Sequence, residues 1–151
     1  MEMVSRLGLN FGRWRGTDKA FRGTCDDGNA YYYFGGAAGQ AGIFSDAADV
    51  ARLGSLYLEC GEQKFPGYLD PGIRSASVIN RGHERGYGFQ FGPLYPEGGF
   101  GHTGFTGTYI YINPETGITV AALTNRLHVP KPVDINSFRK EIAEKALALF
   151  A

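Results

Sequence analysis

The stretch that decides the fold is Gly98–Asn125, GGFGHTGFTGTYIYINPETGITVAALTN. Its middle, Thr108–Ile112, is rich in β-branched and aromatic residues, a composition that favours a strand. Asn113–Gly117 then supplies a proline that fixes one φ angle and a glycine free to take a positive one, which is typical of a turn. Ile118–Leu123 is almost entirely apolar, as expected of a strand covered on both faces. We therefore predict three short antiparallel strands in succession, with the tripeptide His102–Gly104 at the first bend.

Helical patterns flank this stretch on both sides. Ser45–Cys60 has a candidate N-cap in Ser45, and acidic residues in its first turn complement the helix dipole. Pro71 opens a short helix that runs to about Ile79. The chain ends in a helix predicted over Asn136–Phe150, with an apolar stripe that should lie on the sheet. The stripes expected to be buried are Val50, Leu53, Tyr57 and Cys60 in the first helix, and Ile135, Phe138, Ile142, Ala146 and Leu149 in the last.

The order of these patterns defines the fold class. Tyr87, Phe89 and Phe91 alternate along the chain and predict one further strand. The fold class is therefore α+β: a helical first half, a short antiparallel sheet of about three to four strands in the second half, and a terminal helix packed on the sheet. We expect one structural unit with two regions, residues 1–82 with the helices and a Gly-rich segment, and residues 83–151 with the sheet and the terminal helix.

Composition excludes several classes of function. The 151 residues suffice for one domain with a buried core. Because 15 basic residues balance 15 acidic ones, we expect no nucleic-acid partner. No apolar run approaches the roughly 18 residues of a membrane span, and the first residues lack the apolar core of a secretory signal. The spacing of Cys25 and Cys60 is typical of neither a disulfide framework nor a metal site, so no cofactor and no metal are expected.

Within the Gly-rich segment Asp27–Ser45 (DGNAYYYFGGAAGQAGIFS), Tyr31–Phe34 followed by GGAAGQAG superficially imitates a nucleotide-binding turn. Gly36, Gly39 and Gly42 recur at every third residue, however, and the spacing G-x-G-x-x-G and a following Lys-Ser/Thr pair are both missing. We interpret GGAAGQAG (Gly35–Gly42) as a loop in which backbone packs closely against backbone.

Two separated blocks carry a resemblance to a known family. His102–Gly104, the hairpin after it, the string LTNR and the terminal helix resemble the last part of the β-lactamase-like serine hydrolases. This superfamily includes D-Ala-D-Ala carboxypeptidases, class C β-lactamases and esterases. The Gly-rich segment is similar to the one that precedes the motif in a bacterial branch, although Asp26 and Gln40 stand where that branch often has histidine. The resemblance covers most of Gly23–Ala151 and implies an incomplete β-lactamase-like fold without its N-terminal portion.

The resembled family uses three motifs in the order Ser-x-x-Lys, Tyr-x-Asn or Tyr-x-Ser, and Lys-Thr-Gly or His-Thr-Gly. The resemblance implies that His102 and Thr103 face the substrate, that Gly104 completes the motif, and that the backbone N–H of Phe105 is one oxyanion donor. These four residues form the expected site. Because imidazole is largely neutral near pH 7, His102 in place of lysine favours the carboxypeptidase or esterase branches over β-lactam hydrolysis.

Strings that match the other two motifs stand in the wrong order. Ser137–Lys140 (SFRK) follows the HTG strand and lies in the predicted terminal helix. Tyr111–Asn113 (YIN) runs from a strand into a turn. Because such short matches are common without structural context, we interpret both as structural and expect the chain to lack the nucleophile.

Three interpretations remain open. The leading one is the C-terminal portion of a β-lactamase-like serine hydrolase, inactive alone, whose complete form transfers acyl groups of peptides, esters or β-lactams to water. The chief rival is a non-catalytic module that keeps the HTG groove and binds a peptide or ester-like ligand, and the third is a structural remnant without a ligand. The expected partners are the missing N-terminal portion, the substrate, and a second copy paired through the strand 118–123. The compartment stays open, although complete relatives are often extracytoplasmic in bacteria.

Overall fold

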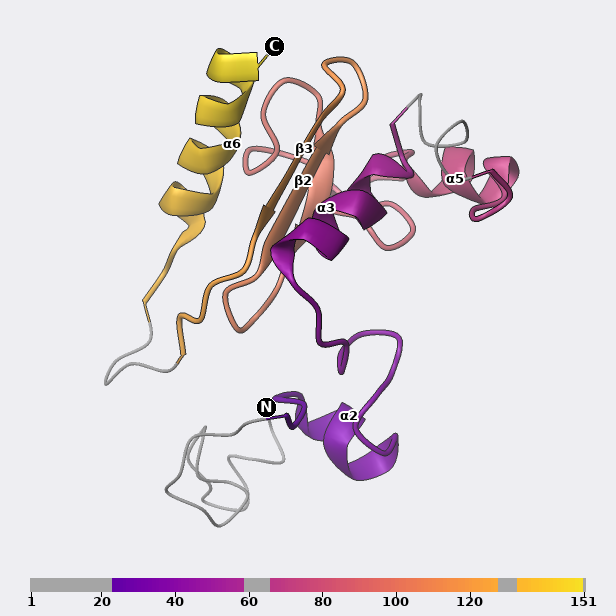
Figure 1. The fold of residues 1–151 in the computed structure, drawn as a ribbon, viewed down its shortest axis with the longest axis vertical. Coiled ribbons are helices and arrows are strands. Elements are labelled where there is room, and N and C mark those ends of the chain that lie inside the picture. Colours follow the sequence, from indigo (N-terminus) through magenta and orange to yellow (C-terminus); the bar gives the residue numbers. More distant parts are fainter. Residues whose placement is uncertain (1–22, 59–65, 128–132, 151) are drawn as a thin grey trace. The chain divides into compact units, whose positions relative to one another are not determined.

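The computed structural model describes residues 23–58, 66–127 and 133–150. They form two compact units, one that ends at Phe44 and one that begins at Ser45, and each unit is described by itself (Figure 1). Cys60, the expected end of the first long helix, lies outside the described residues. The division near residue 82 stays a prediction.

The first unit contains a short helix that the sequence patterns did not predict, α2 (Gly28–Tyr33). The Asp27 side chain caps it by accepting a hydrogen bond from the Ala30 N–H at 2.7 Å. The Gly-rich loop follows, and a Cβ added at Gly42 would overlap the carbonyl oxygen of Gly36. Since Gly42 also has a φ of +107°, only glycine fits there, and the interpretation of a loop with close backbone packing is confirmed.

The second unit is built on a three-stranded antiparallel sheet in the order β1-β2-β3. The strands are β1 (Phe100–Thr103), β2 (Tyr109–Asn113) and β3 (Ile118–Ala122), so the prediction of three successive strands is confirmed. In the β2–β3 turn, the Asn113 side chain accepts hydrogen bonds from the N–H groups of Glu115 and Thr116, at 2.9 and 3.1 Å. These bonds close the turn and fix the register of the hairpin.

A helix covers each face of this sheet, which makes the unit α+β as predicted (Figure 1). α3 (Ala47–Ser55) lies against one face, and α6 (Asn136–Phe150) lies against the other. Because side chains alternate along a strand, β2 divides its residues between the two layers. On the α3 face Ile112 packs with Leu58 and Phe100. On the α6 face the buried residues are Tyr95, Tyr109, Tyr111, Ala122, Ala143 and Leu147.

The buried side of both long helices differs by about one residue from the predicted stripe. In α3 the buried residue is Gly54, while Leu53 is 50% exposed. In α6 the buried residues are Arg139, Ala143 and Leu147, while Phe138 and Leu149 are exposed. The cause in α3 is close approach, because the Gly54 Cα comes so near β2 and β3 that no side chain fits between them. The helix N-cap is also Asp46 instead of Ser45, since the Asp46 carboxylate accepts from the Asp49 N–H at 2.9 Å.

The segment before β1 contains one predicted helix and one incorrectly predicted strand. α5 (Pro71–Ser77) confirms the helix that Pro71 was expected to open. The strand predicted from Tyr87, Phe89 and Phe91 is wrong: the segment forms only two isolated bridges, Arg85 with Gln90 and Gln90 with Gly101. The physical reason is that glycines with positive φ at 88 and 92 interrupt the extended backbone on both sides. Phe89 and Phe91 instead pack around Phe100, at 4.9 and 5.9 Å between ring centroids, whereas Tyr87 is exposed and its ring lies against the Arg81 guanidinium.

Within the described ranges, none of the helices combines the length and the apolarity that a membrane crossing requires.

Candidate functional site

The two central residues of the HTG motif point to opposite faces of the sheet. His102 pairs with Ile110, whose side chain lies beside Gly54 of α3, whereas Thr103 pairs with Tyr109 of the α6-side core. The His102 side chain is exposed, and its Nδ1 lies 2.9 Å from the Thr103 carbonyl oxygen. The motif therefore offers functional groups on both sides of the β1 edge.

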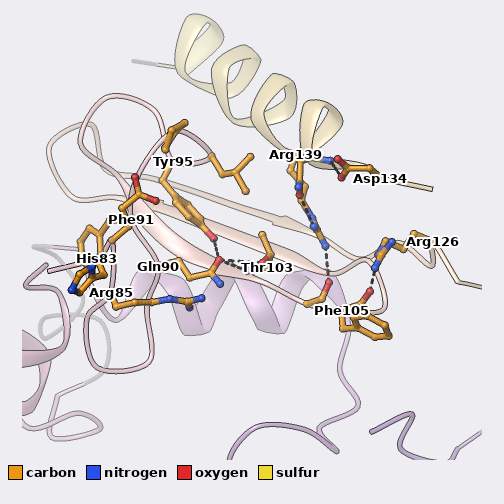
Figure 2. A pocket seen from close by; sticks show the side chains of 15 residues that line it. His83, Arg85, Gln90, Phe91, Tyr95, Thr103, Phe105, Arg126, Asp134 and Arg139 are labelled. Carbon is orange, nitrogen blue, oxygen red and sulfur yellow. Dashed lines mark hydrogen bonds between the residues drawn. The ribbon is translucent and has the colours of Figure 1, made fainter. Parts of the chain in front are cut away.

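A cleft of about 700 Å³ opens on the Thr103 side of this edge (Figure 2). Thr103, Gly104 and Phe105 line it, so it contains three of the four expected site residues. His102 does not line this cleft, because the alternation of β1 directs its side chain to the other face. The remaining walls come from a loop at residues 83–85, the segment 90–95, and the start of α6 with the residues just before it.

Gln90 holds Thr103 in place from within the cleft (Figure 2). Its Oε1 accepts hydrogen bonds from the Thr103 hydroxyl at 3.1 Å, the Thr103 N–H at 3.3 Å and the Tyr95 hydroxyl at 2.6 Å. A backbone N–H can only donate, so the amide atom at this position is the oxygen. The pKa of Tyr95 is raised to about 12 by burial, although Arg139 and Arg85 act against this shift. Tyr95 is therefore a neutral donor near pH 7.

The bend after Thr103 depends on glycine at two places. The Gly104 N–H donates to the Thr108 carbonyl at 2.7 Å, and the Gly107 N–H donates to the Gly104 carbonyl at 3.2 Å. A Cβ at Gly104 would overlap the Thr108 hydroxyl, and Gly107 has a φ of +127°. The spacing of these glycines in HTGFTG is thus a requirement of the bend.

The cleft is lined by three arginines and two carboxylates: Arg85, Arg126, Arg139, Glu84 and Asp134. Arg139 is only 5% exposed, and burial lowers the pKa of its guanidinium, with the neighbouring charge of Arg126 as the next cause. His83 and Glu84 have φ angles of +52° and +56°, which is uncommon for residues with side chains. Arg126 belongs to the string LTNR, which contributes to the family resemblance without indicating a role at the site. Sequence patterns gave no signal for the other charged residues of the cleft or for Gln90 and Tyr95, since each reaches the cleft through the tertiary fold.

The residues of the two strings that imitate the other motifs, Ser137–Lys140 and Tyr111–Asn113, are exposed on a helix or take part in the packing of the fold. Ser137 is exposed on α6, and Lys140 forms an ion pair with Glu144 at 3.4 Å. Tyr111 and Asn113 are buried: the Tyr111 hydroxyl donates to the Pro96 carbonyl at 2.9 Å, and the Asn113 amide donates to the Tyr111 hydroxyl at 3.0 Å. Burial also raises the pKa of Tyr111. The side chains of Tyr111 and Asn113 lie on the face of the sheet opposite His102, and Ser137 and Lys140 belong to the helix that covers this opposite face.

Comparisons with known proteins agree with this fold and motif. The family model described as Beta-lactamase matches residues 11–144, and the chain therefore belongs to this family of β-lactamase-like serine hydrolases, as the resemblance predicted.

A relative from Bacillus subtilis (strain 168), named N-acetylmuramyl-L-alanine amidase, is 34% identical over 123 residues, which cover 72% of this chain and 27% of the relative. A relative from Escherichia coli (strain K12), named "Putative D-alanyl-D-alanine carboxypeptidase", is 31% identical over 125 residues, with coverages of 72% and 28%. The chain thus spans just over a quarter of the length of these curated relatives. No solved structure gives a significant match.

Proposed function

We propose that this chain carries the His-Thr-Gly wall of the acyl-transfer site of a serine hydrolase that acts on peptide, ester or β-lactam substrates. The observation that supports it is the joint position of Thr103, Gly104 and Phe105 at one cleft, on the edge strand of a β-lactamase-family sheet. The names of the relatives, an amidase and a D-alanyl-D-alanine carboxypeptidase, favour amide bonds of peptides that contain alanine.

In this proposal each motif residue has a distinct role. A serine attacks the substrate carbonyl, the leaving group departs, and water hydrolyses the resulting acyl-enzyme. The Phe105 N–H is one donor to the oxyanion, and the Thr103 hydroxyl contacts the substrate. His102 projects from the opposite side of the same edge strand, toward the α3 layer. The substrate would therefore contact His102 and Thr103 together only across the strand edge, and the attacking serine would be supplied at that edge from outside this chain.

We further propose that the chain does not hydrolyse substrate by itself. Ser137, the serine of the only Ser-x-x-Lys string in its sequence, belongs to α6, and α6 packs on the face opposite His102. Tyr111 is fully buried and donates its proton to a backbone carbonyl. Neither group reaches the HTG edge without rearrangement of the sheet.

A second candidate function is non-catalytic binding of a peptide or ester-like ligand. The cleft favours it because Thr103 and Gln90, which holds it by hydrogen bonds, both line the cleft and both belong to this chain. Binding at this cleft needs no nucleophile.

One experiment tests the main proposal. The chain is assayed with a chromogenic β-lactam and a short-chain nitrophenyl ester, and N-acetyl-D-alanyl-D-alanine is titrated in parallel with amide shifts recorded by NMR. We expect no hydrolysis above background, and shifts at Thr103–Phe105 that weaken in Thr103→Val but not in the control Thr106→Val, since Thr106 does not line the cleft. Product formation abolished by Ser137→Ala, or ligand shifts confined to residues outside the cleft, would overturn the proposal.

A further inference from the structure

Every carbonyl in the bend after the HTG motif accepts a hydrogen bond from a donor outside the bend. Arg139 Nη2 donates to Gly104 at 2.7 Å, and Arg126 Nε donates to Phe105 at 2.8 Å. The Arg126 backbone N–H donates to Thr106 at 2.8 Å, and the Thr124 hydroxyl donates to Gly107 at 2.7 Å. Two of these four donors are guanidinium groups. Such charge-assisted bonds are stronger than the bonds between neutral groups.

Burying the Arg139 guanidinium costs free energy. It is 5% exposed, and its Nε has no hydrogen-bond partner among the described residues. Burying a guanidinium costs free energy unless its donors are satisfied, and an apolar side chain of similar length would anchor α6 at lower cost. Its remaining bonds go to the Thr108 carbonyl at 3.0 Å and to Asn136 Oδ1 at 2.9 Å. Arg139 Nη2 therefore donates to two carbonyls, that of Gly104 at the start of the bend and that of Thr108 directly after it.

Arg126 approaches the same bend from the chain after β3. Besides the Phe105 carbonyl, it donates to the Val133 carbonyl at 2.9 Å, and its guanidinium lies 5.1 Å from the centroid of the Phe105 ring. Figure 2 shows Arg139 and Arg126 reaching the bend side by side, with their bonds to residues 104 and 105. Two successive peptide groups are thus each held by a different arginine.

The orientation of a carbonyl fixes the orientation of the next N–H. In a trans peptide the two point in opposite directions, so holding the Gly104 carbonyl toward Arg139 turns the Phe105 N–H away from Arg139. Arg126 fixes the peptide between Phe105 and Thr106 in the same manner.

We propose that Arg139 and Arg126 are positioning residues that set the peptide orientation of the Gly104–Gly107 bend, and with it the direction of the Phe105 N–H. Neither guanidinium is assigned to the reacting atoms, and both act through the backbone. The importance of the Phe105 N–H rests on the proposed function, whereas the control of the bend does not. The competing explanation is that Arg139 only anchors the terminal helix.

Amide hydrogen exchange, followed by NMR, separates these explanations. The reporters are the N–H groups of Gly104 and Gly107, which are hydrogen-bonded within the bend, and their rates are divided by those of β2 amides to remove changes in global stability. In Arg139→Met we expect both to exchange roughly tenfold faster, the factor that corresponds to the loss of a charge-assisted bond. The control Leu147→Ala removes a buried side chain from the same face of α6 without touching the bend, and should leave the ratio unchanged.

Further variants keep the test decisive. Arg139→Lys, which retains the charge without the planar fork, should give an intermediate ratio. If Arg139→Met does not fold, Arg126→Gln, at a partly exposed position, should still accelerate Gly107. Unchanged ratios in the arginine variants, or an equal acceleration in Leu147→Ala, would overturn the proposal. Failure of the wild-type chain to bind N-acetyl-D-alanyl-D-alanine would instead count against the proposed function, because the exchange ratios are measured without ligand.

Discussion

The Oε1 atom of Gln90 accepts hydrogen bonds from both the hydroxyl and the backbone N–H of Thr103, at 3.1 and 3.3 Å. The Gln90 backbone also exchanges two hydrogen bonds with Gly101, at 2.7 and 3.1 Å. Gln90 thus extends the edge of the sheet by one residue, and its side chain reaches along β1 to the HTG motif. Tyr95 donates to the same oxygen at 2.6 Å, so three donors share one acceptor.

Removal of this acceptor should destabilise the protein. In Gln90→Met the hydroxyls of Thr103 and Tyr95 lose their partner, and we expect a loss of roughly 1–3 kcal/mol in the free energy of unfolding. Tyr95→Phe removes one donor, so the double variant should lose less than the sum of the two single losses, with a coupling of roughly 0.5–3 kcal/mol. Urea unfolding measures the cycle, and Gln40→Met, at an exposed position, serves as the control. Strictly additive losses would show that the three side chains do not act as one network.

The sequence predicts the elements whose signals are local. The β2–β3 hairpin follows from its turn residues, and α6 begins and ends where its pattern indicates. α2 was not predicted because its six residues are too few to show a helical period of apolar side chains, although Asp27 is a typical N-cap residue. In α3 the predicted buried face is wrong by about one residue. The buried face is set by Gly54, which contacts the sheet, and a glycine does not count in a pattern of apolar side chains.

The site is predicted only in part for a similar reason. The motif at residues 102–105 is contiguous, so its place on the edge strand can be anticipated. The residues that hold it, Gln90, Arg126 and Arg139, come from 12 or more positions away, and their contacts exist only in the folded chain. Arg126 lies in the string LTNR and Arg139 in the string SFRK, but neither string indicates that its arginine contacts the bend at residues 104 and 105.

Gly54→Ala should destabilise the protein, although alanine is the better helix former. A Cβ at Gly54 would overlap the Thr119 methyl group and crowd Ile110 and Ile112. Overpacking of this kind costs roughly 1–3 kcal/mol, which exceeds the gain in helix propensity of about 1 kcal/mol. The matched control is Gly72→Ala in α5, where the new Cβ would meet only the Asp70 carboxylate. Thermal unfolding should show a lower Tm for Gly54→Ala than for the control, and an equal or higher Tm would contradict the close approach of α3.

Alkaline pH should unfold the second unit through its buried tyrosines. Burial raises the pKa of Tyr95 from 10.0 to about 12, and it raises the pKa values of Tyr109 and Tyr111 as well. Because the unfolded chain releases these protons at lower pH than the native one, each tyrosine stabilises the fold until the pH rises above its native pKa; the contribution of Tyr95 is complete below pH 10 and is lost as the pH rises through about 12. Urea unfolding between pH values of about 9 and about 11 should show a falling free energy, with a shallower fall in Tyr95→Phe. A flat profile over this interval would mean that the tyrosines ionise in the folded state.

The outer edge of the sheet should make the chain associate with itself. Within the described residues β3 pairs with β2 alone, so its other edge presents backbone N–H and C=O groups without strand partners. The strand ITVAA contains no charge and no proline, the usual protections of an exposed edge, and such an edge is a template for pairing with another chain. Antiparallel pairing of two β3 strands about a two-fold axis would satisfy both edges at once, which makes a symmetric dimer the simplest product.

Light scattering on the purified chain at micromolar concentration measures this association directly. Leu123→Lys places a charge at the end of the strand, where the side chain is 40% exposed, and should shift the mass toward the monomer while the circular dichroism spectrum is kept. Leu149→Lys is the matched control, because the same substitution at a position that is 74% exposed on α6, outside the strand itself, should leave the mass unchanged. Val120→Lys, which would put a charge against the α6-side core, should instead unfold the protein. A stable, soluble monomer of the unmodified chain would disprove association through β3, since it would show that the outer edge of this strand does not pair with a second chain.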